Sequence, residues 1–70
     1  MTEAEEKFLA KVEDTLWSHT GDCESVKYII EDMRSEKENI GGSLVAICWA
    51  VLVDRGFYGA AREIQSWSVE

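Results

Sequence analysis

Few residues in this chain could stabilise a small fold by cross-linking or by binding a metal ion. Its 70 residues include two cysteines and one histidine, His19. Two cysteines are too few for a disulfide scaffold, and one histidine cannot anchor a zinc site of the usual Cys/His type. A chain of this length buries only about 60% of the surface that its unfolded form exposes, so its own core is small. We therefore expect association with another chain, and no metal or cofactor, to complete the fold.

Basic residues are also scarce, since seven lysines and arginines stand against fourteen acidic residues and give a formal net charge of −7. Proteins bind nucleic acid mainly by neutralising phosphates with Lys and Arg, so this balance argues against direct binding of nucleic acid or of anionic membranes. No signal-peptide pattern follows Met1. The longest apolar run, residues 44–53, is half of the roughly 20 residues that cross a bilayer. The sequence predicts a cytoplasmic protein with reduced thiols.

The first helix is predicted from a capping box. Thr2 and Glu5 have the spacing at which each side chain bonds the backbone amide of the other. Gly21 is expected to end this helix in the left-handed conformation. One arc of the helix is mostly apolar, and most of the acidic residues lie outside it. That arc contains Ala4, Phe8, Leu9, Val12, Thr15, Leu16 and His19.

A second helix is predicted to begin after Asp22, which is a favourable N-cap, and to end at Asn39 and the glycine pair 41–42. Its pattern is amphipathic, which is typical of a helix at the surface of a small protein. The apolar arc contains Cys23, Val26, Ile29, Ile30, Met33 and Ile40. The opposite arc contains Glu24, Lys27, Glu31, Asp32, Ser35 and Glu38.

The third segment, residues 44–53, is apolar at every position and follows a potential cap, Ser43. Its valines would suit a buried strand, but its length, its alanines and the lack of a second strand favour a helix. A helix that is apolar all round must be covered all round, and the other short helices can cover only one or two of its sides. We therefore expect a homo-oligomer, most simply a dimer, although a different protein could cover this helix instead. The residues expected at the interface are Leu44, Ile47, Cys48, Trp49, Val51 and Leu52.

A fourth helix is predicted over residues 57–67, where Phe57, Ala60, Ala61, Ile64 and Trp67 share one arc. The glycine at position 56 either closes the third helix or lies within one continuous helix of about 25 residues. The expected fold is therefore all-α, a single domain over residues 1–70 with three to four short helices in a bundle completed by homo-oligomerisation.

Enzymatic chemistry finds little support in this sequence. Cys23 could gain thiolate character at the start of a helix and could lie near His19, but Asp22 and Glu24 flank it and raise the pKa of a thiol. Cys23 is therefore interpreted as a packing residue, His19 as a hydrogen-bonded core or boundary histidine and Cys48 as part of the core. We expect no enzyme, no catalytic residue and no metal site.

An anion site is the alternative to a protein-binding function. The Gly41-Gly42-Ser43 segment before a helix offers free amides at a positive helix end, but it lacks a phosphate-binding motif. A small anion or nucleotide could bind there if Arg55 or Arg62 came from a second subunit. The alternative function is thus a small-ligand binder with a pocket between subunits.

Acidic and aromatic residues point to protein binding. Residues 1–38 carry a net charge of −6 and residues 39–70 a net charge of −1, so the charge lies on the first two helices. Two aromatic residues, Trp17 and Tyr28, fall outside the apolar arcs, and Trp and Tyr are frequent interface hot spots. The predicted partner-binding residues are Trp17, Tyr28, Glu24, Glu31, Asp32 and Glu38.

These features predict a small acidic non-enzymatic protein, an adaptor or inhibitor, that binds another protein with a basic surface. In size, acidity and lack of catalytic groups the chain resembles the small inhibitors that phages and mobile elements direct against host proteins, although no motif carries this resemblance. A second alternative is a DNA mimic that inhibits a nucleic-acid-binding protein.

Overall fold

The computed structural model describes residues 1–69 and places four α-helices in them. They are α1 (Glu3–His19), α2 (Cys23–Ile40), α3 (Leu44–Asp54) and α4 (Tyr58–Ile64). No strand occurs among residues 1–69, so the all-α prediction is confirmed and a strand over residues 44–53 is wrong. None of these helices is long and apolar enough to cross a membrane.

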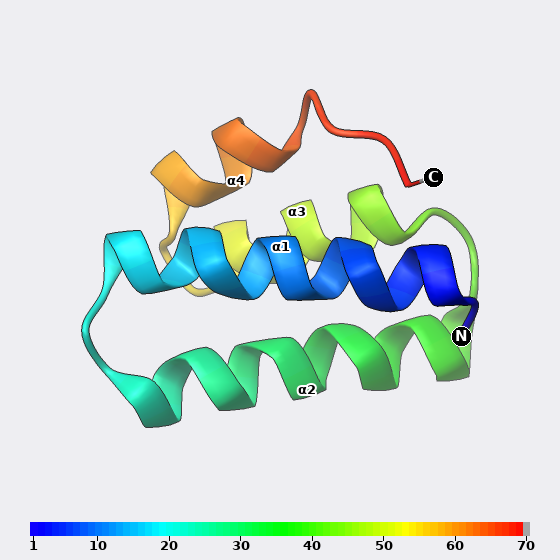
Figure 1. Cartoon of the computed structure of the whole chain (residues 1–70), viewed down its shortest axis with the longest axis horizontal. Helices are drawn as coiled ribbons and strands as arrows, with labels where there is room; N and C mark the ends of the chain where they lie inside the picture. Colours follow the sequence, from blue (N-terminus) through cyan, green and yellow to red (C-terminus); the bar gives the residue numbers. More distant parts are fainter. Residues whose placement is uncertain (70) are drawn as a thin grey trace.

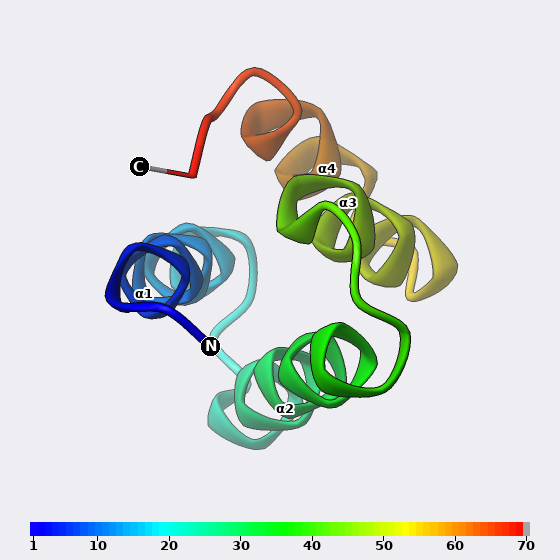
Figure 2. The same cartoon turned by 90° about the vertical axis from the view of Figure 1, so that its right-hand side faces the viewer.

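The helices are arranged around one apolar centre. In Figure 1, α1 and α2 lie side by side and run in opposite directions, with α3 behind α1 and α4 above it. Figure 2 shows the same arrangement along the helix axes. Each helix packs on the next in sequence, and α4 packs back on α1. The contacts between helices therefore form a closed ring.

The predicted N-caps are confirmed. Thr2 Oγ1 accepts from the Glu5 amide at 3.2 Å, and Glu5 Oε1 accepts from the Thr2 amide at 3.0 Å. Asp22 accepts from two amides at the start of α2, and Ser43 Oγ accepts from the Ala46 amide at 3.4 Å. Local side-chain chemistry thus fixes where three of the helices begin.

The predicted end of the first helix is wrong in its mechanism. The helix ends at Thr20, whose backbone is extended with φ −149°, and the following Gly21 does not adopt a positive φ. The Thr20 hydroxyl accepts from the Asp22 amide at 3.2 Å. This bond shapes the turn, so a left-handed residue is not needed.

A Schellman motif separates α3 from α4. Gly56 has φ 86°, its amide donates to Val53 O at 3.1 Å, and the Phe57 amide donates to Leu52 O at 2.8 Å. These are the two bonds that define the motif. The alternative of one continuous helix is therefore wrong, because the left-handed glycine turns the chain.

The fourth helix is shorter than predicted and ends at Ile64, so Trp67 lies beyond it. Trp67 nevertheless packs against α1, where its ring meets that of Phe8 edge-on with centroids 5.9 Å apart. The Lys11 ammonium lies 4.7 Å from the centroid of the Trp67 ring. The segment after α4 is thus held to α1 by aromatic contacts.

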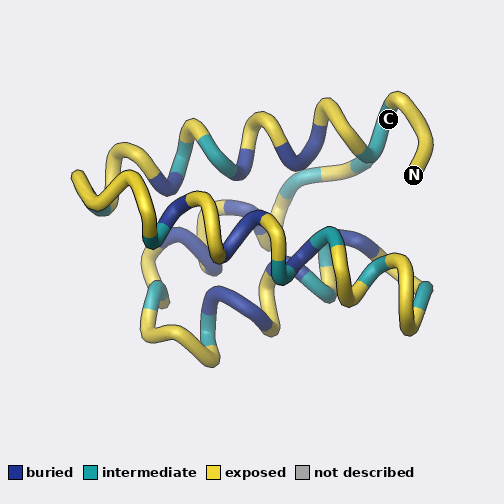
Figure 3. Tube along the Cα trace, turned by 90° about the horizontal axis from the view of Figure 1, so that it is seen from below, coloured by how far each residue is buried: buried dark blue, intermediate teal, exposed yellow. Residues whose placement is uncertain are grey.

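The core is apolar and receives side chains from all four helices, and buried and exposed positions alternate along each of them (Figure 3). Its buried residues are Phe8, Leu9, Val12, Leu16, Val26, Ile29, Ile30, Met33, Leu44, Cys48, Val51, Leu52, Ala60, Ala61 and Ile64. The predicted apolar arcs of the first two helices are largely confirmed.

Two residues predicted on the apolar arc of the second helix are exposed. Cys23 is exposed, and the Ile40 side chain is 76% exposed. They are the first and last residues of α2, where fewer neighbours surround a side chain. The interpretation of Cys23 as a packing residue is therefore wrong.

Candidate interaction surfaces

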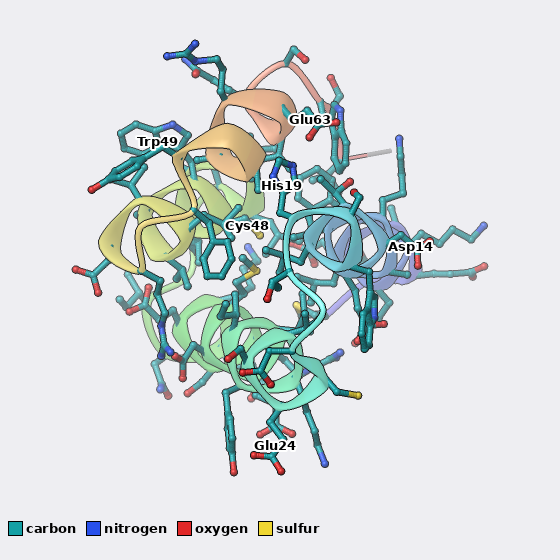
Figure 4. The ribbon with its side chains drawn as sticks, turned by 90° about the vertical axis from the view of Figure 1, so that its left-hand side faces the viewer. Asp14, His19, Glu24, Cys48, Trp49 and Glu63 are labelled. Carbon is teal, nitrogen blue, oxygen red and sulfur yellow. The ribbon has the colours of Figure 1, made fainter. Side chains whose placement is uncertain are left out.

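An exposed acidic ridge runs along α2. We define the acidic ridge as the exposed residues that recur every three or four positions on the outer side of this helix: Glu24, Tyr28, Glu31, Ser35 and Glu38. The Tyr28 side chain is 60% exposed. The three glutamates of the ridge form no ion pair within the described residues. In Figure 4, Glu24 points away from the bundle. Four of the six predicted partner-binding residues therefore share one surface.

The other two predicted partner-binding residues lie on either side of the ridge. Trp17 is 44% exposed and lies on the side of α1 that also carries Glu6, eleven residues earlier. Because Glu6 pairs with Arg34 of α2, this is the edge of α1 next to α2. Asp32 is half-buried and pairs with Arg55, which directly follows α3, so Asp32 lies on the side of α2 next to α3.

Most of the cations on α2 are engaged inside the chain. Arg34 pairs with Glu6, and Lys37 Nζ lies 3.2 Å from Glu5 Oε2 and donates to Gly42 O at 2.6 Å. Hydrogen bonding to Arg34 lowers the pKa of Glu6. Bonding to the Thr2 amide, and then to Lys37, lowers the pKa of Glu5. Arg34 and Lys37 thus pair with α1, although Glu38 and Glu31 also attract the Arg34 charge. The third cation of α2, Lys27, is exposed four residues before Glu31.

The third helix is covered by its own chain on one side only. Of the six residues predicted at an oligomer interface, Leu44, Cys48, Val51 and Leu52 are buried in the core of the single chain. These four residues need no second chain to cover them, because α2 and α4 pack on this helix. Ile47 is half-buried, and Trp49 is 42% exposed.

The opposite side of α3 carries no charge. We define the α3 outer face as Ala46, Trp49, Ala50 and Val53, which follow the i, i+3, i+4, i+7 spacing of one helix side. Both alanines are exposed, and Val53 is half-buried. Figure 4 shows Trp49 pointing outward and Cys48 pointing inward from the same helix. The sequence did not predict this face, because every residue from 44 to 53 is apolar and the pattern does not distinguish one side of the helix from the other.

Two surface grooves border α3. The larger, with a volume of about 750 Å³, lies between α2 and α3. Its lining consists of Asp32, Ser35, Glu36, Asn39, Ile40, Ala50, Val51, Asp54 and Arg55. The smaller, of about 380 Å³, is lined by Ser43, Val45, Ala46, Trp49 and Gln65. Sequence analysis did not identify either groove.

The only histidine of the sequence is hydrogen-bonded, as predicted, but it is exposed and does not belong to the core. His19 Nε2 lies 2.9 Å from Glu63 Oε2, which joins the end of α1 to α4 (Figure 4). The ring also packs on Gly59, where an added Cβ would stand 3.2 Å from His19 Cε1. Glycine at this position therefore permits the close approach of the two helices.

The two cysteines differ in burial, since Cys23 is exposed and Cys48 is buried. Burial raises the pKa of the Cys48 thiol to about 12, so this core thiol remains protonated. Among residues 1–69, no group of three or more His, Cys, Asp and Glu side chains is placed to hold a metal ion.

The glycine turn and Arg55 of the alternative anion site are separated within one chain. Gly41 and Gly42 precede α3, whereas Arg55 follows its last residue and pairs with Asp32. A helix of 11 residues spans about 16 Å. A site that combines the turn with Arg55 would therefore need a second subunit, as the sequence-based hypothesis stated.

Comparison of the chain with protein-family models, with curated proteins and with solved structures found no match.

Proposed function

We propose that this chain is a non-enzymatic protein that acts as an adaptor or inhibitor by binding a protein with a basic surface through the acidic ridge. The observation that carries the proposal is the placement of Tyr28, 60% exposed, among carboxylates that have no cationic partner. An exposed tyrosine offers a large rigid contact surface, and unpaired carboxylates attract a basic partner and orient it. The ridge extends for about 21 Å from Glu24 to Glu38, which suits a protein surface.

The test of this function is capture of binding partners by the immobilised chain and by two variants, Tyr28→Ala and Glu31→Lys. We expect each to reduce capture by about tenfold or more, because a hot-spot contact and a charge contact are lost. Helical content should be unchanged, since both side chains are exposed.

Asp14→Lys is the matched control, because Asp14 is an exposed acid on α1 and points to a different side from Glu24 (Figure 4). It changes the net charge by the same amount as Glu31→Lys and should retain capture. Equal loss in Asp14→Lys and Glu31→Lys would show that only overall charge matters and would contradict the proposal.

We also propose that a second copy of the chain covers Ala46, Trp49 and Val53 of the α3 outer face and completes the bundle as a dimer, while Ala50 lines the larger groove. Supporting this choice, the face is uncharged, and residues 39–70 carry a net charge of −1 against −6 for residues 1–38. Two copies could thus meet through their nearly neutral halves while the acidic ridges remain apart.

Light scattering over a wide range of concentration tests the dimer. We expect twice the chain mass for the natural sequence and the mass of one chain for Trp49→Glu, which places a charge in the contact. A natural chain that remains monomeric throughout would contradict this proposal and leave the ridge proposal intact.

A further inference from the structure

The larger groove, here called the α2–α3 groove, has both apolar and charged residues in its lining. Ile40, Ala50 and Val51 line it from the two helices. Ile40 is more exposed than any other large hydrophobic side chain among residues 1–69. This exposure places apolar surface where a bound segment would contact it.

Carboxylates stand on both walls of this groove. Asp32 and Glu36 belong to the α2 wall and Asp54 to the α3 wall. Glu36 and Asp54 make no ion pair within the described residues, whereas Asp32 is bound by Arg55. The groove thus has apolar residues and an unpaired carboxylate on each of the two helices that line it.

The pattern that complements this surface is a helix with a narrow apolar stripe and basic residues on both sides of the stripe. The wall from Asp32 to Ile40 extends for about 12 Å, which is slightly more than two helical turns. A helix seated between two others also follows the packing of helical bundles.

A second copy of this chain does not offer such a helix. The two long helices each carry five acidic residues, against two basic residues in α1 and three in α2. The shorter helices have no excess of basic residues either. The occupant must therefore come from a different protein.

From the apolar residues and the unpaired carboxylates that both helices contribute to the lining, we infer that the α2–α3 groove binds a basic amphipathic helix of the partner protein. This inference rests on the proposed function and specifies the form of the partner. The groove borders the acidic ridge, since Ser35 belongs to both. One partner could thus insert a helix into the groove and place the rest of its basic surface on the ridge.

The probe for this inference is a synthetic peptide of about 18 residues, composed of leucine and lysine, with leucine at the i, i+3, i+4, i+7 spacing. A control peptide has the same composition but no leucine stripe. Both carry a fluorophore, and their binding to the whole chain is measured by fluorescence anisotropy at about 0.15 M salt. We expect the striped peptide to bind at least about tenfold more tightly than the control.

Three variants locate the bound peptide. The double variant Glu36→Lys/Asp54→Lys reverses charge on both walls and should weaken binding by about tenfold or more. The double variant Glu24→Lys/Glu31→Lys makes the same change in net charge on the ridge and should weaken it by less than about threefold. Ile40→Ser changes no charge and should weaken it by about threefold or more, because apolar contact is lost.

Mapping of backbone amide NMR shifts in the natural chain tests the site without a substitution. The largest shifts on adding the striped peptide are expected in residues 32–40 and 50–55. The inference is wrong if the two double variants lose affinity equally, if both peptides bind alike, or if the largest shifts lie elsewhere. If only the ridge variant lost affinity for the striped peptide, the inference about the groove would be wrong and the proposed function would stand. Loss of partner capture in the ridge variants tests that function separately.

Discussion

The two halves of this molecule are stabilised by different means. In the first half, α1 and α2 have amphipathic patterns, side-chain caps and ion pairs that join one helix to the other. In the second half, α3 is almost wholly apolar and α4 has no side-chain cap. The ion pairs of α3 and α4 within residues 1–69 join them to the first half, through Arg55–Asp32 and His19–Glu63.

This difference indicates that the second half depends on the first. Isolated helices shorter than about 12–15 residues are marginal in water, and α3 and α4 have 11 and 7 residues. Their stability must come from packing against α1 and α2. Charge is concentrated on the first half, where the chain is proposed to bind a partner. The uncharged surface lies on α3, where the chain is proposed to self-associate.

The largest expected contrast between the halves is the reactivity of their cysteines. Cys23 is exposed, whereas Cys48 is buried with a pKa raised to about 12. Cys48 should react only when the fold opens, so for a stability near 5 kcal/mol its alkylation should be slower by about a thousandfold. Mass spectrometry after timed iodoacetamide treatment measures both rates. Similar rates in the folded chain would contradict the arrangement, and similar rates in denaturant are the control.

Truncation of the core on α3 is expected to have the next largest effect. Leu52 is completely buried, so Leu52→Ala should lower the free energy of unfolding by about 2–5 kcal/mol. On the exposed side of the same helix, Ala50→Ser should change it by less than about 0.5 kcal/mol. Urea denaturation followed by circular dichroism compares them. Equal changes in the free energy of unfolding would contradict the burial of Leu52 and the exposure of Ala50.

Removal of a helix cap should have a smaller effect, and one that differs between the halves. Asp22 accepts from two backbone amides and from the Ser25 hydroxyl, so Asp22→Ala should cost about 1 kcal/mol of unfolding free energy. Ser43 accepts a single bond at 3.4 Å, so Ser43→Ala should cost less. The same denaturation experiment measures both, and a larger loss for Ser43→Ala would reverse the comparison.

Lowering the pH is expected to reduce the free energy of unfolding slightly, through carboxylates in α1 and at the start of α2. Hydrogen bonds lower the pKa of Glu5 and Glu6 below 4.5 and that of Asp22 below 3.8. The folded chain therefore binds protons less readily than the unfolded chain, and unfolding free energy is lost as the pH falls through these lowered values. Denaturation between about pH 6 and pH 3 should show a shallower slope for Glu6→Gln than for the natural chain. An identical slope would mean that the Arg34–Glu6 pair contributes nothing to acid sensitivity.

The helix boundaries could be predicted because the signals are local. Thr2, Asp22 and Ser43 act on amides two or three residues away, and Gly56 acts within its own turn. The acidic ridge could also be predicted in large part, since helical spacing alone places Glu24 beside Tyr28.

Features that depend on how helices meet could not be predicted in the same way. Both sides of α3 are apolar, so periodicity does not show that Leu52 faces inward and Ala50 outward. The groove depends on where α3 crosses α2, a contact marked by Asp32 and Arg55, which are 23 residues apart. The exposure of Ile40 likewise depends on where its neighbours end.

The closed ring of helices has a consequence for the order of folding. Neighbouring helices are joined by three-residue loops, so their pairing closes only short stretches of chain. The contact of α1 with α4 instead joins distant parts of the sequence, through Phe8 with Trp67 and His19 with Glu63. Such long-range closure is the slow step in small proteins. We expect the helical pairs to form first and the Trp67 ring to reach Phe8 last.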